Sequence, residues 1–233
     1  MKKSADLASE AHSIAMEKTH SQIAEWEIQA IIEGHFQSKG SQWSYPSIVG
    51  GGDNATILHY HANNKSVKDG DLILVDAGCE IDGYASDITR TWPANGKFSE
   101  AQREIYNLVL TAEIAAIEAC QIGSPWNSSH RASMEVISRG LIELGILDCS
   151  FEEAMGDDLD GKTRQFFMHG TSHSLGLDVH DVGVTRPEGK GDGRLLEEGM
   201  VLTVEPGLYF GSWREDITIP EKYSGIGIRI EDN

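Results

Sequence analysis

The sequence of 233 residues has few cysteines, few prolines and no long hydrophobic run. Its three cysteines, Cys79, Cys120 and Cys149, are widely spaced and form no CxxC pair, which argues against a disulfide framework or a zinc–thiolate site. No segment approaches the roughly 18 apolar residues that a membrane-spanning helix needs. The N-terminus carries lysines but no apolar stretch behind them, unlike a signal peptide. These absences predict a cytoplasmic protein with no membrane partner.

Basic residues are also scarce. Nineteen Lys and Arg stand against 37 Asp and Glu, which gives a formal net charge of −18. Because such a chain repels phosphate groups, we expect no nucleic-acid partner. Some of the carboxylates lie inside apolar runs, where an uncompensated charge is costly. Those carboxylates are the ones that call for a chemical explanation.

The first half of the chain predicts helices followed by a sheet. Residues 5–38 have helical spacing of apolar residues, with a break near Ser21. Short β-like runs follow, separated by Gly, Asn and Asp, and we expect strands over residues 56–61, 72–79 and 84–92.

The second half repeats this order. Ser99 and Gln102 form a capping box that opens one helix, and another is predicted from about 127 to 144. The strands expected after them are 182–185, 201–205 and 226–231. The sequence therefore predicts an α+β fold of two pseudo-symmetric helix–helix–sheet halves around a curved antiparallel sheet.

Two aspartates are predicted to meet on one face of the first sheet. Asp82 and Gly83 form a two-residue hairpin turn, so that Asp76 pairs with Thr89. Asp87 then lies diagonal to Asp76 on the same face, roughly 7–8 Å away along the backbone. The alternative is a strand-end Asp and a turn Asp that never meet, and the spacing of this pair alone does not decide.

The second half supplies matching groups. Three histidines, His169, His173 and His180, lie within twelve residues among glycines. Glu205 closes an apolar run, and Glu231 lies in an alternating strand pattern. Two Asp, one His and two Glu make a hard, oxygen-rich ligand set whose four carboxylates balance two divalent cations. This set favours Mn²⁺, Co²⁺ or Zn²⁺ in a two-metal site that activates water for hydrolysis.

These segments resemble the creatinase/methionine aminopeptidase superfamily, whose members have the pita-bread fold, and most closely the catalytic domain of the aminopeptidase P family. The resemblance extends from about Ala8 to Glu231. It is carried by five blocks in the family's order, Val75–Gly78, Ser86–Thr91, His169–Gly183, Val204–Gly207 and Arg229–Glu231.

The resemblance implies a dinuclear metal site, usually holding Mn²⁺. Asp76 would bind one ion, Asp87 and Glu231 would bridge the two, and His173 and Glu205 would hold the other. The same resemblance implies cleavage between an N-terminal residue and a following proline, through a water activated by the metal pair.

Further roles are also implied by the resemblance. Glu205 would act as general base, and His59 and His180 would stabilise the tetrahedral intermediate and the departing amine. His169 would lie at the substrate cleft. Arg229 would contact the metal ligands and orient them without binding the metal itself.

The remaining histidines are expected to have no role in the site. His61 shares the predicted strand face of His59 and is expected to be a neighbour without a role. We expect the others to face solvent, namely His12, His20, His35 and His130.

We expect residues 1–233 to form a single catalytic metallopeptidase domain. Members of the family usually carry an N-terminal domain and continue past the last ligand, so the chain would lack that domain and be truncated at its C-terminus. The predicted partners are peptides with proline at the second position, and a homo-oligomer is compatible with the family.

Two alternatives remain open. Prolidase, which cleaves dipeptides, shares nearly every one of these sequence blocks. The short 209–225 connection and the sequence Thr171–His173 favour aminopeptidase P. The fold also serves as a non-catalytic binding module in proteins that have lost metal ligands.

Gly50–Asp53 is a weak candidate for nucleotide binding and is better explained as a tight turn.

Overall fold

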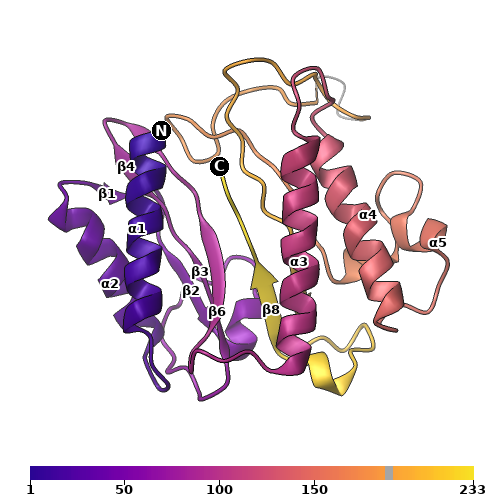
Figure 1. The fold of residues 1–233 in the computed structure, drawn as a ribbon, viewed down its shortest axis with the longest axis horizontal. Coiled ribbons are helices and arrows are strands. Elements are labelled where there is room, and N and C mark those ends of the chain that lie inside the picture. The colour runs from indigo at the N-terminus through magenta and orange to yellow at the C-terminus, as the bar shows by residue number, and fades with distance from the viewer. Residues whose placement is uncertain (187–190) are drawn as a thin grey trace.

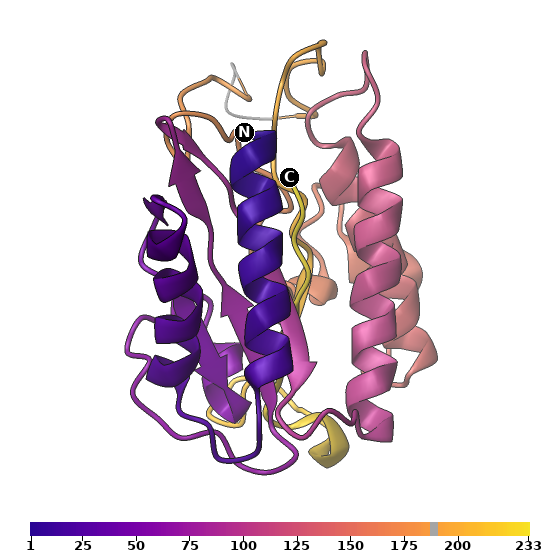
Figure 2. The same cartoon turned by 60° about the vertical axis from the view of Figure 1, so that its left-hand side comes forward.

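Pairs of helices lie outside the strands in this computed structural model, which describes residues 1–186 and 191–233 (Figures 1 and 2). Helices α1 and α2 pack on the strands of the first half, and α3 packs on β8 of the second half. The helices are α1 (Lys2–Lys18), α2 (Glu25–Ser38), α3 (Glu100–Ala119), α4 (Ser128–Glu143) and α5 (Phe151–Met155), with 3₁₀ turns η1 (Gly52–Thr56), η2 (Lys162–Gln165) and η3 (Glu221–Tyr223).

The strands form three small antiparallel sheets, ordered β1-β4-β5, β2-β3-β6 and β7-β8. Their bounds are β1 (Gln42–Trp43), β2 (Ile48–Gly51), β3 (Leu72–Asp76), β4 (Cys79–Ile81), β5 (Tyr84–Ala85), β6 (Thr89–Pro93), β7 (Gly207–Phe210) and β8 (Ile226–Arg229). Among the described residues, none of the helices has the length and apolar composition that crossing a bilayer requires.

The predicted hairpin is confirmed. Asp82 and Gly83 have φ of 54° and 82°, as the turn of a two-residue hairpin requires, and Asp76 pairs with Thr89. Gly78 permits the close crossing beside this hairpin, because a Cβ there would lie 1.8 Å from the carbonyl oxygen of Ser86. The chain segments that carry Asp76 and Asp87 are therefore held close together.

Each half has its own hydrophobic core. One cluster joins α1 and α2 to β2 and β3, and a second joins α3 and α4 to β7 and β8. The halves meet where Thr89 forms an isolated antiparallel bridge with Glu231 and where Thr91 donates a hydrogen bond to the carbonyl of Arg229. This seam places the end of the second sheet beside Asp76.

Several predicted strands are wrong. In the predicted strand 56–61, Thr56 ends the 3₁₀ turn η1 and residues 57–61 have no strand, because the strand of this region is β2, directly before η1. Gly50 and Gly51 belong to β2, so the predicted tight turn begins only at Gly52. Residues 182–185 are irregular, and the segment 201–205 forms only isolated bridges at Leu202 and Val204.

Two histidines expected at the surface are buried. His12, on α1, donates from Nε2 to the carbonyl of Ala77 at 3.0 Å, and burial lowers its pKa to about 4. His130, on α4, is hydrogen-bonded to Thr171 Oγ1 at 2.8 Å, and burial lowers its pKa to about 4 as well. Both imidazoles are therefore neutral at physiological pH and act as packing groups with one fixed hydrogen bond.

Helix α3 carries a buried carboxyl group that lacks compensation. Glu113 is 2% exposed, and neither carboxyl oxygen has a hydrogen-bond partner within the part of the chain that the structure describes. Burial, followed by the negative charge of Asp232, raises the pKa of Glu113 from its ordinary 4.5 to about 9. The folded protein therefore holds Glu113 protonated at neutral pH, whereas the unfolded chain ionises it.

We predict that Glu113→Gln stabilises the protein increasingly as the pH rises. Between pH 4.5 and about 9 the unfolded chain binds fewer protons at this site than the folded one, so wild-type stability falls with pH. Relative to wild type, the free energy of unfolding of the variant should gain about 2–4 kcal/mol between pH 5 and pH 8. Denaturant unfolding at both pH values measures it.

The matched control is Glu118→Gln, which removes an exposed carboxylate from the same helix. It should leave the pH dependence of unfolding unchanged. A difference between Glu113→Gln and wild type that is constant from pH 5 to pH 8 contradicts the raised pKa.

Candidate metal centre

The two predicted aspartates lie together at the centre of the fold. Asp76 ends β3 and Asp87 precedes β6, and the hydroxyl of Tyr45 is 2.5 Å from a carboxylate oxygen of each. A phenol carries one proton and can donate to only one carboxylate at a time. Tyr45 therefore cannot compensate the negative charge of both carboxylates. Burial raises the pKa of Asp76.

His173 brings the second half into the same place. Its Nε2 is 3.3 Å from Asp87 Oδ2 and 3.4 Å from Glu205 Oε1. The other ring nitrogen, Nδ1, lies 3.1 Å from the carbonyl of Ser174, which can only accept a hydrogen bond. Nδ1 therefore carries a proton and leaves Nε2 to face the carboxylates, as in a metal-binding histidine.

Glu231 completes the cluster. It is buried, and Thr89 Oγ1 donates to its Oε2 at 2.6 Å. Asp87, His173 and Glu231 each offer one ligand atom, and these atoms all lie within 4.8 Å of one another. Bonds of about 2 Å from nitrogen and oxygen ligands to a divalent cation fit that spacing. Three segments far apart in the sequence thus form a possible cation site.

The charges of the site favour a bound cation. Burial raises the pKa of Glu205 to about 7 and that of Glu231 well above its ordinary value, with further contributions from the neighbouring carboxylates. Burial lowers the pKa of His173, but the hydrogen bond to Asp87 and the negative charge of Glu205 outweigh it and raise the pKa overall. Four carboxylates around one centre, two of them buried and two half-buried, are the arrangement that divalent cations stabilise.

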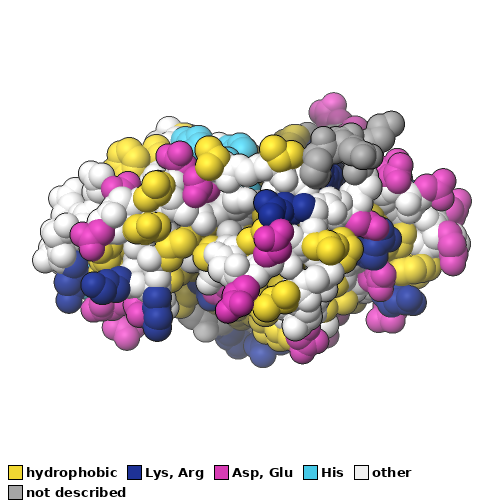
Figure 3. Space-filling model, turned by 90° about the horizontal axis from the view of Figure 1, so that it is seen from above, with side chains coloured by type: hydrophobic (Ala, Val, Ile, Leu, Met, Phe, Trp, Pro, Cys, Tyr) yellow, Lys and Arg dark blue, Asp and Glu magenta, His cyan; other side chains and the backbone are white. Residues whose placement is uncertain are grey.

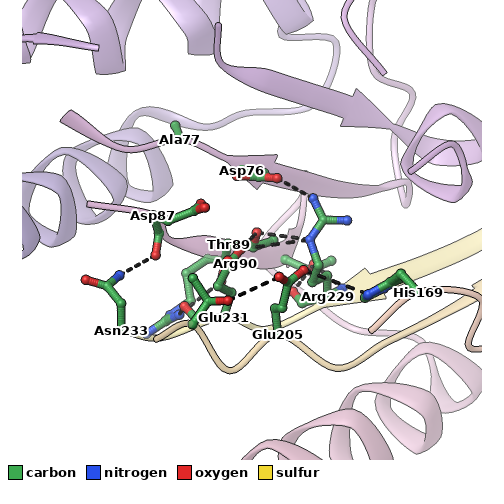
Figure 4. A network of polar contacts seen from close by, with 12 residues as sticks. Asp76, Ala77, Asp87, Thr89, Arg90, His169, Glu205, Arg229, Glu231 and Asn233 are labelled. Carbon is green, nitrogen blue, oxygen red and sulfur yellow. Dashed lines mark hydrogen bonds and ion pairs between the residues drawn. The ribbon is translucent and has the colours of Figure 1, made fainter. Parts of the chain in front are cut away.

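Arg229 is a cation that the chain itself places among these carboxylates. Its Nη2 donates to Asp76 Oδ2 at 2.5 Å, its Nε to Thr89 Oγ1 at 3.1 Å and its Nη1 to Tyr209 Oη at 3.0 Å. Figure 4 shows its guanidinium among the carboxylates of Asp76, Glu205 and Glu231. One guanidinium offsets one of the four charges, and its planar donors fix the orientation of the Asp76 carboxylate.

Histidines surround the opening of this site. A cavity of about 130 Å³ is lined by all five predicted ligands, by Arg229 and by four further residues, Leu58, His59, His169 and His180. The ring of His180 lies 4.3 Å from that of His173, centroid to centroid. Seen from above, histidine side chains reach the surface along one edge of the molecule (Figure 3).

His169 has a defined tautomer. Its Nδ1 lies 2.7 Å from the carbonyl of Gly170, so Nδ1 carries the proton, and Nε2 accepts from Tyr209 Oη at 2.8 Å. Burial and the charge of Arg229 lower the pKa of His169 to about 3. Gly207 leaves room for this contact, since a Cβ there would lie 2.4 Å from Tyr209 Oη.

All of the predicted site residues therefore line one cavity. His59 does so from the irregular segment after η1 rather than from a strand, and His61, which is exposed, is absent from the lining. Sequence reasoning missed Tyr45 and Tyr209. No periodic pattern marks Tyr45, whereas the alternation in β7, with Leu208 and Phe210 in the core, could have indicated that Tyr209 points to the site.

Comparison with known proteins places the chain in a family. The sequence profile of metallopeptidase family M24 matches residues 1–233. The chain belongs to this family. It is 45% identical to the Xaa-Pro aminopeptidase of Escherichia coli K12 over 234 residues, which cover all of this chain and 51% of that protein. It is 48% identical to the Xaa-Pro aminopeptidase of Haemophilus influenzae, covering all of this chain and 52% of the relative.

Solved structures agree. The aminopeptidase PepP of Pseudomonas aeruginosa superposes with a TM-score of 0.93 at 46% identity, over 100% of this chain and 51% of that one. Aminopeptidase P of E. coli with the inhibitor Pro-Leu gives 0.92 at 46% identity, over 99% and 51%. The predicted α+β pita-bread fold is confirmed. The chain spans about half the length of the curated relatives it matches.

We predict that the chain binds Mn²⁺ through this cluster. His173→Ala removes the one nitrogen ligand, and we expect the affinity for Mn²⁺ to fall by more than about a hundredfold, beyond the 10–100-fold effect of changing an outer partner. Titration calorimetry with the metal-free protein measures the affinity. The rise of Tm on adding Mn²⁺, which binding to the folded state produces, should disappear in the variant.

His61→Ala is the matched control, because His61 is exposed and lies outside the cavity lining. It should bind Mn²⁺ like wild type. Unchanged affinity in His173→Ala would show that the cluster is not the metal site.

Proposed function

We propose that this chain is the catalytic part of a metal-dependent aminopeptidase that hydrolyses the bond between an N-terminal residue and a following proline. The observation that supports this most is the convergence of Asp76, Asp87, His173, Glu205 and Glu231 on one histidine-lined cavity. The relatives with 45–48% identity along the whole chain are named Xaa-Pro aminopeptidases, and this favours the same substrate class here.

The proposed ligands hold two divalent ions, of which Mn²⁺ is favoured over Co²⁺ or Zn²⁺. Asp76, Asp87, His173, Glu205 and Glu231 would together hold these ions. When bound, such a pair supplies an activated water and electrostatic stabilisation of developing negative charge. The raised pKa values of Glu205 and Glu231 support this assignment, because these carboxylates gain most from a nearby cation.

The chain's own side chains supply the remaining chemistry. Glu205 is the proposed general base, and burial brings its pKa to about 7, near the pH at which a base works best. His59 and His180 are proposed to donate hydrogen bonds to the tetrahedral intermediate and to the departing amine. His169, with both ring nitrogens already hydrogen-bonded, forms a fixed neutral wall of the cleft. Arg229 orients Asp76.

Two competing functions are less well supported. A prolidase would have the same ligands but cleave dipeptides, and the names of the similar proteins favour the aminopeptidase. A binding module that had lost catalysis would lack ligands, whereas all five line the cavity here. The cytoplasmic location, a possible homo-oligomer, the absence of nucleic-acid partners and the single-domain organisation stay predictions.

We predict that the Mn²⁺-loaded chain releases the first residue from a tripeptide with proline in second position. Chelation should abolish this activity and Mn²⁺ should restore it. Asp87→Asn should lower kcat/KM by at least about a thousandfold, because a residue proposed to hold the metal ions is lost. Quantifying the released amino acid measures the rate.

Asp148→Asn, which removes an exposed carboxylate that is not part of the cavity lining, is the control and should keep wild-type activity. Turnover of Xaa-Pro dipeptides without turnover of the tripeptide would identify a prolidase instead. A chain that binds Mn²⁺ but cleaves neither peptide would favour the binding module.

A further inference from the structure

Helix α2 begins with a buried carboxylate that faces the segment carrying His59. Glu25 is 0% exposed and is the first residue of α2. Its Oε1 accepts from the backbone N–H of Gly51 at 2.9 Å and from Asn54 Nδ2 at 2.8 Å. Its Oε2 accepts from Tyr60 Oη at 2.9 Å and from the backbone N–H of Lys65 at 2.9 Å.

These four donors make Glu25 the organising point of the segment 51–65. Each carboxylate oxygen accepts two hydrogen bonds from neutral donors, and the positive end of the α2 dipole adds to the stabilisation. The donors are distributed along fifteen residues, Gly51 to Lys65, most of which lie outside helices and strands. Loss of the carboxylate would leave four donors without their acceptor, and three of them belong to buried or half-buried residues, Gly51, Asn54 and Tyr60.

A second contact with the same helix holds the far end of this segment. Asn63 is buried, accepts from the backbone N–H of Val49 at 3.0 Å and donates to Gln29 Oε1 at 2.9 Å and to the carbonyl of Ser47 at 2.7 Å. Gln29 lies one helical turn after Glu25, so both anchors come from one face of α2.

Between the anchors the chain presents His59 to the cavity. Leu58 and His59 line it, and Leu58 packs against the small cluster of Ala55, Leu74 and Tyr209. His59 itself is exposed, and the next residue, Tyr60, is buried on Glu25. The direction in which His59 points is therefore set by the neighbour that Glu25 holds.

We propose that Glu25 is a positioning residue for the reaction: by fixing the segment 51–65 it holds His59 at the mouth of the cavity. This role rests on the proposed function of His59, and Glu25 itself contacts none of the proposed metal ligands through the hydrogen bonds described. A residue acting in this way affects kcat through His59 and leaves metal binding unchanged. A residue needed only for stability affects the whole fold and couples to no particular side chain.

The first arm of the test is amide hydrogen exchange on the Mn²⁺-loaded chain. In Glu25→Gln the peptides covering 51–65 should exchange faster, with the amides of Gly51 and Lys65 most affected, while the strands β3 and β6 keep their protection. Tyr60→Phe removes one of the four donors with little change of shape and should give a smaller effect in the same peptides. It also carries the test if Glu25→Gln does not fold.

The second arm is a double-mutant cycle on a proline tripeptide. Glu25→Gln should lower kcat roughly tenfold, near the low end of the effect of losing hydrogen bonds to a charged group, with KM within about twofold. In Glu25→Gln/His59→Ala, kcat should equal that of His59→Ala alone, since the carboxylate acts through a side chain already removed. The affinity for Mn²⁺ should stay that of wild type.

Glu27→Gln is the matched control. It removes one negative charge from the same first turn, and its amide can still accept the hydrogen bond that Glu27 receives from the backbone N–H of Ala24. It should change neither the exchange of 51–65 nor kcat.

Three results would overturn the proposal. These are unchanged exchange of 51–65 in both Glu25→Gln and Tyr60→Phe, losses of kcat that add in the double variant, or an equal loss in Glu27→Gln. With an active wild type, each of them overturns only the role of Glu25. A wild type that cleaves no proline peptide would overturn the proposed function and this role with it.

Discussion

The structure depends on gathering four carboxylates, each at least half-buried, around one point. Asp76, Asp87, Glu205 and Glu231 come from four separate segments, and burial raises the pKa of three of them. Such a cluster is unstable by itself, because like charges at short range repel and desolvation removes their compensation. The surrounding residues supply hydrogen-bond donors that offset part of this repulsion and desolvation. A bound cation would balance the negative charge that remains.

The donors come from both halves of the fold. Thr89 lies on β6 of the first half, yet it donates to Glu231 and accepts from Arg229, both from the second half. The bridge between Thr89 and Glu231 therefore joins the halves and places the ligands with one set of contacts. Neither half alone contains a complete ligand set, which explains why the two cores must dock at this seam.

The sequence predicted how Asp76 and Asp87 lie because local rules determine their hairpin. The run Leu72–Val75 and the Asp82–Gly83 turn define one hairpin register, and this register fixes the faces of Asp76 and Asp87. The short β-like run at residues 56–61 predicts a strand around His59, whereas the structure has a loop there. Its conformation depends on Glu25, more than thirty residues earlier, and a distant side-chain contact leaves no local pattern.

The prediction that His12 and His130 face solvent was wrong for a related reason. A polar residue on a helix is usually exposed, yet His12 lies on the face of α1 that carries Ala8, Ala11 and Ala15. These small residues bring α1 close to the sheet, and the imidazole reaches the carbonyl of Ala77, the residue after Asp76. A helical stripe of alanines around one histidine could have indicated this contact.

The histidines of the second half show how far the organisation of the site extends. His130 on α4 packs edge-on against Phe167, and Phe167 packs in the same way against His169. His169 accepts from Tyr209, which accepts from Arg229, which donates to Asp76. The contacts thus run without interruption from a helix of one half to a strand of the other. Arg229 donates to a lone pair of the Tyr209 oxygen, so the phenol proton must point to His169. Nε2 of His169 therefore accepts this proton's hydrogen bond, which fixes the neutral tautomer of the histidine. Burial, and after it the charge of the same guanidinium that orients the Asp76 carboxylate, lowers the pKa of His169, so the two sides of the site are not arranged independently.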